Sequence, residues 1–265
     1  MEVNGNLSFE DENEGTFDPK SPEDKHSLVR LLKPIMFNPE RGKHIDSAVV
    51  SPMFYNCFNY SMLAKEHTGV NLTVGITSAN VGEGKTLVAS NLSVSLASAN
   101  QRDTVLVDLN LQSPRIHKIF GTRLAPGLAE TLNDRPIQVS HTQVKHLYIL
   151  SAGQMPFHSL NADYLGNGEQ VSLAEAQSTL GLDQLASFRN VLYSLRQEFE
   201  FVIVDMPALH EPRIPILLTN QMDGLIVVVD ANRTKHEHIE KMFRRVNQNQ
   251  VIGFVFNRVT KEYAQ

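Results

Sequence analysis

Short apolar runs alternate with longer helical patterns along most of the chain. The helical patterns cover Lys85–Ala99 and Leu182–Glu198, and the runs between and around them are rich in Val, Ile and Leu. These runs predict strands at Thr73–Thr77, Thr104–Asp108, Leu147–Leu150, Phe201–Asp205, Gly224–Val229 and Val251–Asn257. Strands that are apolar throughout and separated by helices are typical of a parallel sheet covered on both faces. The sequence therefore predicts an α/β fold with a doubly wound, mainly parallel sheet.

The segment between the first strand and the first helix has the spacing of a phosphate-binding loop. Ala79–Thr86 reads Ala-Asn-Val-Gly-Glu-Gly-Lys-Thr, with Ala in place of the leading Gly of a P-loop. Gly82 and Gly84 allow main-chain amides to curl around phosphate oxygens, while Lys85 reaches the β and γ phosphates and the Thr86 hydroxyl can ligate magnesium. We therefore expect ATP and Mg²⁺ to bind here, with nucleotide contacts from Val81, Gly82, Glu83, Gly84, Lys85, Thr86 and Leu87.

Two aspartates close apolar strands that follow the P-loop. Asp108 ends Thr104–Asp108, and Asp205 ends Phe201–Asp205. Because ligands of open α/β sheets bind at the carboxyl ends of the strands, both aspartates should face the P-loop. Asp205 would hold magnesium through water, and Asp108 would either bind magnesium or accept a proton from an attacking hydroxyl. We predict Thr86, Asp108 and Asp205 as metal ligands and Lys85, Asp108 and Asp205 as catalytic residues.

Other polar residues at strand ends are weaker candidates. Asn257 and Arg258 end the last strand, where a carboxamide could contact an adenine edge, so we include both among the nucleotide-binding residues. Asp230 ends another apolar run, but capping a turn before Asn232 explains it equally well.

Charge is distributed unevenly along the chain, whose net charge is −5. The acidic surplus lies before His26, in a segment with few large apolar residues. Such a segment cannot bury enough surface to offset its ordering entropy, so we predict that residues 1–47 are a disordered N-terminal region. Residues 48–265 then form the P-loop ATPase domain. This part lacks a basic surplus, which disfavours nucleic acid as a partner.

The apolar runs are too short for membrane spans, which need roughly 20 residues. The acidic start of the chain, up to Phe17, lacks the basic and apolar regions of a secretory signal. The single cysteine, Cys57, excludes an internal disulfide and fits a reducing compartment. We therefore expect a cytoplasmic protein without a transmembrane segment of its own.

The motifs together resemble those of a known family. Ala79–Thr86 is similar to its Walker A motif, Val105–Asp108 followed by Asn110 to its Walker A′ segment, and Val204–Pro207 to its Walker B motif. From about Leu72 to Thr260, the chain resembles the bacterial tyrosine kinases (BY-kinases) of capsule and exopolysaccharide production, which are relatives of the MinD and ParA ATPases.

This resemblance implies a P-loop NTPase fold with the deviant Walker motif of MinD-like proteins. It also implies tyrosine phosphorylation, of the protein itself or of a neighbour, that regulates polysaccharide synthesis and export. The implied partner is a membrane-bound polysaccharide co-polymerase (chain-length determinant protein), which would bring the chain to the inner face of the plasma membrane. A homo-oligomer is a further implied assembly.

Some positions depart from the family pattern and keep alternatives open. Asn110 stands where the family has the second acid of the Walker A′ segment. The helical pattern at Met53–Tyr60 lacks the Glu and two Arg that the family usually has there. The family's tyrosine-rich tail is reduced to Tyr263. One alternative is therefore a non-catalytic ATP-dependent switch or scaffold for the co-polymerase. Another is a MinD/ParA-like positioning ATPase. That branch has a lysine at the position of Asn80, and its absence here favours the kinase branch.

Overall fold

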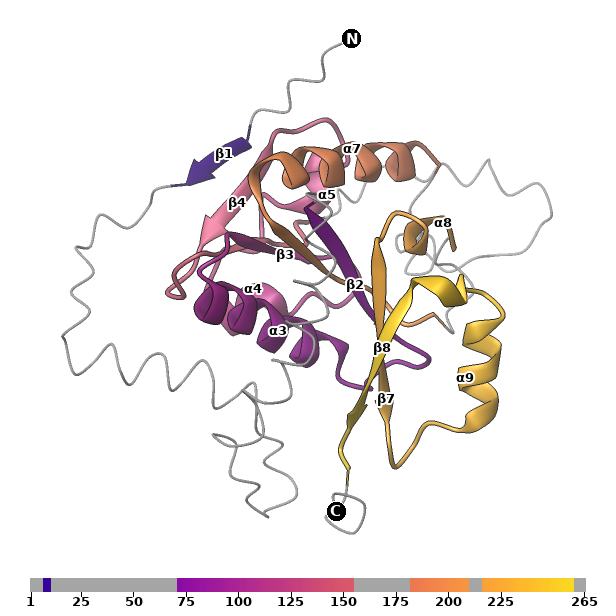
Figure 1. The fold of residues 1–265 in the computed structure, drawn as a ribbon. Helices are drawn as coiled ribbons and strands as arrows, with labels where there is room; N and C mark the ends of the chain where they lie inside the picture. Colours follow the sequence, from indigo (N-terminus) through magenta and orange to yellow (C-terminus); the bar gives the residue numbers. More distant parts are fainter. Residues whose placement is uncertain (1–6, 11–70, 155–181, 210–215, 260–265) are drawn as a thin grey trace, which may run out of the picture.

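A computed structural model of the chain describes residues 7–10, 71–154, 182–209 and 216–259 (Figure 1). The boundary at residues 47/48, the aromatic pattern at Met53–Tyr60 and Tyr263 therefore lie outside the described residues. Within the described part, none of the helices has the length and apolar character needed to cross a bilayer.

An eight-stranded sheet forms the centre of the described part of the chain. From one edge to the other its strands are β1 (Leu7–Glu10), β4 (Ile137–His141), β5 (Leu147–Leu150), β3 (Thr104–Asp108), β6 (Phe201–Asp205), β2 (Leu72–Ser78), β7 (Gly224–Asp230) and β8 (Val251–Asn257). Neighbouring strands are parallel, except that β4 and β5 are antiparallel. The predicted mainly parallel sheet is confirmed.

Two apolar layers cover the sheet, one on each face. Successive strand residues point to opposite faces, so in β3 Val105 and Val107 join one layer while Leu106 joins the other. Helix α7 (Leu182–Glu198) packs on the first face and helix α3 (Lys85–Asn100) on the second (Figure 1). Covering both faces explains why the strands are apolar throughout.

The structure adds elements that the apolar pattern did not predict. They are α4 (Ile116–Phe120), α5 (Leu128–Thr131), β4, α8 (Ile216–Thr219) and the 3-10 helix η3 (Gln248–Gln250). Helix α9 (His236–Phe243) lies between β7 and η3. Strand β4 is a short run in which buried and half-buried residues alternate, so it lacks the continuous apolar character used to find the others.

Strand β1 lies within the leader that the sequence predicts to be disordered. It pairs in parallel with β4, with Leu7 opposite Ile137. The prediction therefore differs from the structure at these four residues. The physical reason is that the outer edge of β4 offers unpaired main-chain groups to which another strand can add.

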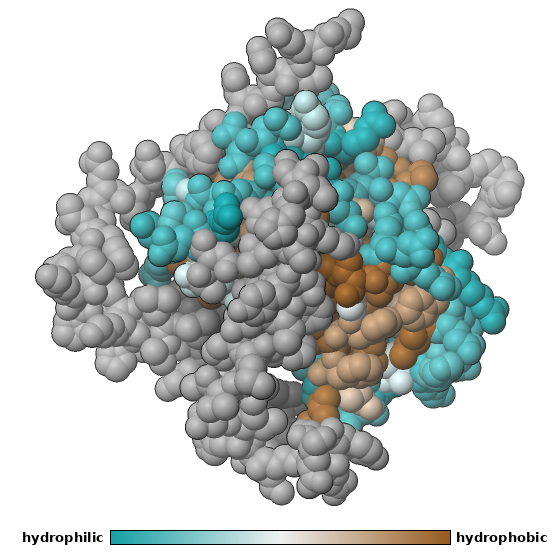
Figure 2. All heavy atoms as spheres, viewed as in Figure 1, coloured by the Kyte–Doolittle hydropathy of each residue, from teal (hydrophilic) through white to brown (hydrophobic). Residues whose placement is uncertain are grey.

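The opposite edge of the sheet carries exposed aromatic side chains. On β8, Phe254 is 38% and Phe256 61% exposed, and the Phe254 ring lies 5.7 Å from that of Phe243 on α9. Figure 2 shows hydrophobic residues gathered on the face where β8 runs in Figure 1. Exposed apolar residues on an edge strand are typical of surfaces that pack against another segment or chain.

Candidate nucleotide site

The P-loop joins β2 to α3 at the carboxyl end of the sheet. Helix α3 begins at Lys85, directly after Gly84. Gly82 and Gly84 have φ angles of 83° and 104°, which only glycine adopts without strain. A Cβ at Gly84 would also lie 2.2 Å from the Asn257 amide nitrogen, so any side chain here would displace Asn257. The loop thus has the backbone that a phosphate cradle requires.

Lys85 is held inside the curl of the loop. Its side chain is buried, and Nζ donates a hydrogen bond to Ser78 Oγ at 3.0 Å. The Ser78 hydroxyl in turn donates to the carbonyl of Asn80 at 2.6 Å. The loop therefore positions the ammonium group, and its contact with the β and γ phosphates stays a prediction.

The two predicted aspartates lie side by side next to the start of α3. Asp108 and Asp205 are paired in register on the adjacent strands β3 and β6, and both are buried. The Thr86 hydroxyl donates to Asp205 Oδ2 at 2.6 Å. The structure thus brings Asp108, Asp205 and Thr86 together at the P-loop, although they are distant in the sequence.

Burial shapes the acidity of both aspartates. The pKa of Asp205 is raised to about 7, mainly by desolvation and also by the nearby charge of Asp108, while the Thr86 hydrogen bond and Lys85 oppose the shift. Desolvation also raises the pKa of Asp108 to about 6, against hydrogen bonds from main-chain amides. The pair therefore titrates near neutral pH, as groups at functional sites often do.

This pair is suited to a magnesium ion that arrives with phosphate groups. Asp205 Oδ1 is buried and has no hydrogen-bond partner, so the site contains an unused acceptor oxygen. The described residues include no cluster of three His, Cys, Asp or Glu side chains that could hold a metal alone. Mg²⁺ typically takes one or two carboxylates, water and substrate phosphates, which matches this donor set.

Asp108 has a second set of contacts that the sequence did not indicate. Its Oδ1 accepts from the Asn110 amide at 3.1 Å, and its Oδ2 accepts from the amides of Arg115 at 3.3 Å and Ile116 at 3.2 Å. These bonds fix the loop between β3 and α4. They also orient the carboxylate, so its predicted catalytic role has a structural basis and stays a prediction.

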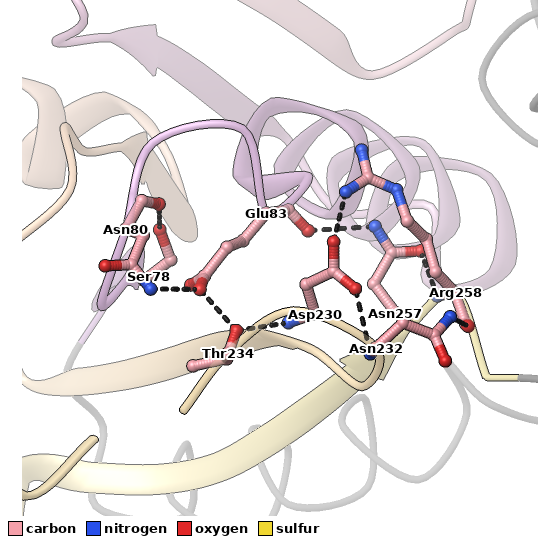
Figure 3. A network of polar contacts seen from close by, with 8 residues as sticks. All are labelled: Ser78, Asn80, Glu83, Asp230, Asn232, Thr234, Asn257 and Arg258. Carbon is pink, nitrogen blue, oxygen red and sulfur yellow. Dashed lines mark hydrogen bonds and ion pairs between the residues drawn. The ribbon is translucent and has the colours of Figure 1, made fainter. Parts of the chain in front are cut away.

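The ends of β7 and β8 contact the other side of the P-loop (Figure 3). Asn257 Nδ2 donates to the Glu83 carbonyl at 2.9 Å, and Arg258 forms an ion pair with Asp230. Asp230 Oδ1 accepts from the Asn232 amide at 3.0 Å, which is the turn cap considered as an alternative. Asn257 therefore supports the loop backbone in this structure, and its contact with adenine stays a prediction.

Residues at the tip of the P-loop, in the first turn of α3 and on the turn after β7 surround the phosphate loop. Val81 is 72% exposed at its tip, and Leu87 is half-buried in the first turn of α3. Thr234 was not predicted, yet its hydroxyl donates to the Glu83 carboxylate across the site. No local pattern signals such a contact, because the two residues are 151 positions apart.

Comparisons with known proteins agree with this geometry. The family model of the CobQ/CobB/MinD/ParA nucleotide binding domain matches residues 74–265. The tyrosine-protein kinase CpsD of Streptococcus agalactiae (serotype Ia) is 25% identical over 73% of this chain and 77% of its own length. The succinoglycan biosynthesis transport protein ExoP of Rhizobium meliloti is also 25% identical, over 70% of this chain but 22% of its own length.

A solved structure shows the same fold. The VpsO kinase domain superposes with a TM-score of 0.61 and 25% identity, covering 80% of this chain and 96% of that one. The resemblance to bacterial tyrosine kinases is thus confirmed by relatives of that name, and the expected MinD-like P-loop fold by the family match. With its phosphate loop, paired aspartates and matched family model, the chain belongs to the CobQ/CobB/MinD/ParA family of nucleotide-binding domains.

Proposed function

We propose that this protein binds ATP with magnesium and transfers the γ-phosphoryl group to a tyrosine hydroxyl, on itself or on a neighbour, to regulate exopolysaccharide or capsule synthesis and export. The observation that carries the proposal is the buried Asp108–Asp205 pair, in register beside the P-loop with Thr86 on Asp205. The names of CpsD, ExoP and the VpsO kinase domain support the phosphoryl acceptor and the pathway class.

The chemistry follows from the positions of the charged groups. The tyrosine oxygen attacks the γ-phosphorus, the bond from this phosphorus to the β–γ bridging oxygen breaks, and ADP leaves. Lys85 stabilises the charge that develops on the phosphoryl oxygens. The hydroxyl proton passes to Asp108, whose pKa of about 6 keeps it ionised and basic near neutral pH. Thr86 and Asp205 would hold the magnesium, which offsets phosphate charge, and Asp108 would join them only in place of its role as proton acceptor.

Incubation of the purified protein with γ-labelled ATP and magnesium tests this reaction. We expect label on tyrosine, located by mass spectrometry, and none in a Lys85→Met control. Protein taken from its own cells should carry phosphotyrosine. If ATP binds but no tyrosine is labelled, even with the membrane partner present, the phosphoryl-transfer proposal fails.

A second candidate is an ATP-dependent switch or scaffold that does not phosphorylate tyrosine. It is favoured by Asn110, which stands at the position of the second Walker A′ acid and uses its main-chain amide to hold Asp108 Oδ1. An amide side chain cannot carry charge or accept a proton as a carboxylate does. Under this proposal ATP binds tightly and is turned over slowly or not at all.

The substitution Asn110→Asp separates the two candidates. If the missing acid limits the reaction, this variant should gain ATP turnover and tyrosine labelling relative to the wild type. Brisk labelling by the wild type itself would exclude the scaffold. A MinD/ParA-like positioning ATPase predicts instead ATP-dependent dimers that attach to membranes, which light scattering and vesicle sedimentation detect.

We also propose a partner and a place for the chain. A membrane-bound polysaccharide co-polymerase is the expected partner, holding an otherwise cytoplasmic protein at the inner face of the plasma membrane. The exposed Phe254 and Phe256 on edge strand β8 favour packing against another chain, either this partner or a second copy. Apart from strand β1, residues 1–47 are proposed as a leader outside the ATPase domain of residues 48–265. Co-purification and cross-linking through β8 test the contact.

A further inference from the structure

Glu83 makes contacts that a phosphate loop does not require. Its side chain is 3% exposed and points from the P-loop toward Thr234, on the turn after β7 (Figure 3). Glu83 Oε1 accepts a hydrogen bond from Asn80 Nδ2 at 2.8 Å and another from the Thr234 hydroxyl. Thr234 Oγ1 in turn accepts from the Asp230 amide at 3.1 Å. A continuous chain of hydrogen bonds therefore runs from the P-loop to the end of β7.

The Glu83 backbone is held as well as its side chain. Asn257, at the end of β8, donates to the Glu83 carbonyl at 2.9 Å and packs so closely against Gly84 that a Cβ there would displace it. Strands β7 and β8 are neighbours in the sheet, so the two contacts on Glu83 come from adjacent strand ends.

The two strand ends are also joined to each other. Arg258 pairs with the buried Asp230, and Asn232 Nδ2 donates to the Arg258 carbonyl at 2.5 Å. The support on which Glu83 rests is therefore a connected polar network. Glu83 Oε1 is hydrogen-bonded in this network while Glu83 Oε2 is buried without a partner, so the orientation of the carboxylate depends on the bonds from Asn80 and Thr234.

The P-loop needs such support because two of its residues are glycines with positive φ. Glycine loses more conformational freedom on ordering than any other residue. A loop that is already held in its binding conformation loses less freedom when the ligand binds, and this raises affinity. Contacts on Glu83 would act in this way, because Glu83 lies between Gly82 and Gly84.

We propose that Thr234 is a positioning residue of the nucleotide site: its hydroxyl holds the Glu83 carboxylate, and through it the P-loop, in the phosphate-binding conformation before the nucleotide arrives. This inference rests on the nucleotide binding proposed above. It assigns a role to a residue on the turn after β7, outside the Walker motifs.

The test compares variants of Thr234 in nucleotide affinity and in loop protection. Thr234→Val keeps the shape but removes the hydroxyl, and should weaken Mg-ATP binding about tenfold by calorimetry, because a hydrogen bond to a charged group is lost. Amide hydrogen exchange at residues 79–84 should be faster in the nucleotide-free variant than in the wild type. Thr234→Ser keeps the hydroxyl and should restore both values.

A matched control removes a threonine hydroxyl at the other end of the sheet. Thr104 is buried, and its hydroxyl donates to the Arg102 carbonyl at 2.9 Å. Thr104→Val should leave both the affinity and the exchange at residues 79–84 unchanged. Equal weakening by this control would overturn the inference, since the effect would then reflect general destabilisation.

A second substitution keeps the inference testable if Thr234→Val fails to fold. Glu83→Met has a similar length but no acceptor oxygen, and should show the same loss of affinity and loop protection, whereas Glu83→Gln keeps an acceptor and should lose less. In the Glu83→Met background, Thr234→Val should have no further effect, because the two residues act as one unit.

The outcomes separate this inference from the proposed function. If the wild type does not bind Mg-ATP, both fall together. If the wild type binds and Thr234→Val binds equally well, or lowers only the melting temperature, then the positioning role alone is overturned.

Discussion

At the amino-terminal ends of β2 and β7 opposite charges meet, whereas at the carboxyl ends of β3 and β6 two like charges lie side by side. At the first end, Arg196 pairs with Asp223 and donates to the Thr73 hydroxyl at 2.7 Å. Asp223 Oδ2 also accepts from the Thr73 amide at 2.8 Å. These contacts tie α7 to the sheet and satisfy the charges involved.

The carboxyl end shows the reverse arrangement. Asp108 and Asp205 are buried together, their pKa values are raised, and Asp205 Oδ1 has no hydrogen-bond partner. Burying like charges costs stability unless a cation offsets them. The amino-terminal ends of the strands therefore stabilise the fold, whereas the carboxyl ends keep charge available for a ligand.

The largest expected effect comes from removing the P-loop lysine that lies near these carboxylates. Lys85→Met should weaken Mg-ATP binding about 100-fold, or about 3 kcal/mol, as loss of a buried charge partner does. Calorimetry measures the affinity. Lys145→Met, an exposed lysine just before β5, is the matched control and should bind normally. Normal binding by Lys85→Met would contradict the assignment of the P-loop lysine.

Neutralising one member of the like-charge pair should stabilise the nucleotide-free protein. The folded pKa of Asp205 is raised from 3.8 to about 7, so its contribution to stability is lost as the pH rises through this window. Asp205→Asn should therefore gain about 2 kcal/mol, or about 6 °C in melting temperature, at pH 8 and little at pH 4.

The matched substitution at the other end should have the opposite sign. Asp223→Asn removes the partner of Arg196 and should lower the melting temperature at pH 8. If Asp205→Asn also lowered it, the contrast between the two ends would be wrong.

The pH dependence of magnesium–nucleotide binding is the next effect in size. A metal ligand must be deprotonated, so affinity should rise about tenfold between pH 6 and pH 8 as a group with a pKa of about 7 ionises. The nucleotide titrates in the same range, but equally for every variant. The part of the rise in affinity that disappears in Asp205→Asn is therefore due to ionisation of Asp205. Identical pH profiles of affinity in the wild type and the variant would refute the role of Asp205 as a metal ligand.

The smallest effect is expected at the satisfied end. Arg196→Met should lower the free energy of unfolding by about 1 kcal/mol in urea, because a partly exposed ion pair contributes little. Mg-ATP affinity should stay within about twofold of the wild type, since the substitution lies far from the P-loop. Arg189→Met, an exposed arginine on the same helix, should change neither value. A large loss of affinity in Arg196→Met would mean that the two ends are coupled.

Sequence patterns predicted the central strands that are buried on both faces and also the edge strand β8, because continuous apolar runs are a strong signal. Strands β3, β5, β6 and β8 have the predicted bounds, and β2 and β7 are longer by one or two residues. Strand β4 was missed because buried and half-buried residues alternate in it instead of forming a continuous apolar run, and α5 was missed because a helix of four residues leaves too little periodicity to detect.

The P-loop and the strand-ending aspartates can be predicted from the sequence alone, because glycine spacing, the Gly-Lys-Thr triplet and apolar runs that stop at Asp are local signals. The shared buried site of Asp108 and Asp205, and the contacts of Thr234 and Asn257 with Glu83, are visible only in the folded structure. The reason is that strand order and register bring together residues more than 90 positions apart. Desolvation and hydrogen bonding depend on that juxtaposition and on no local pattern.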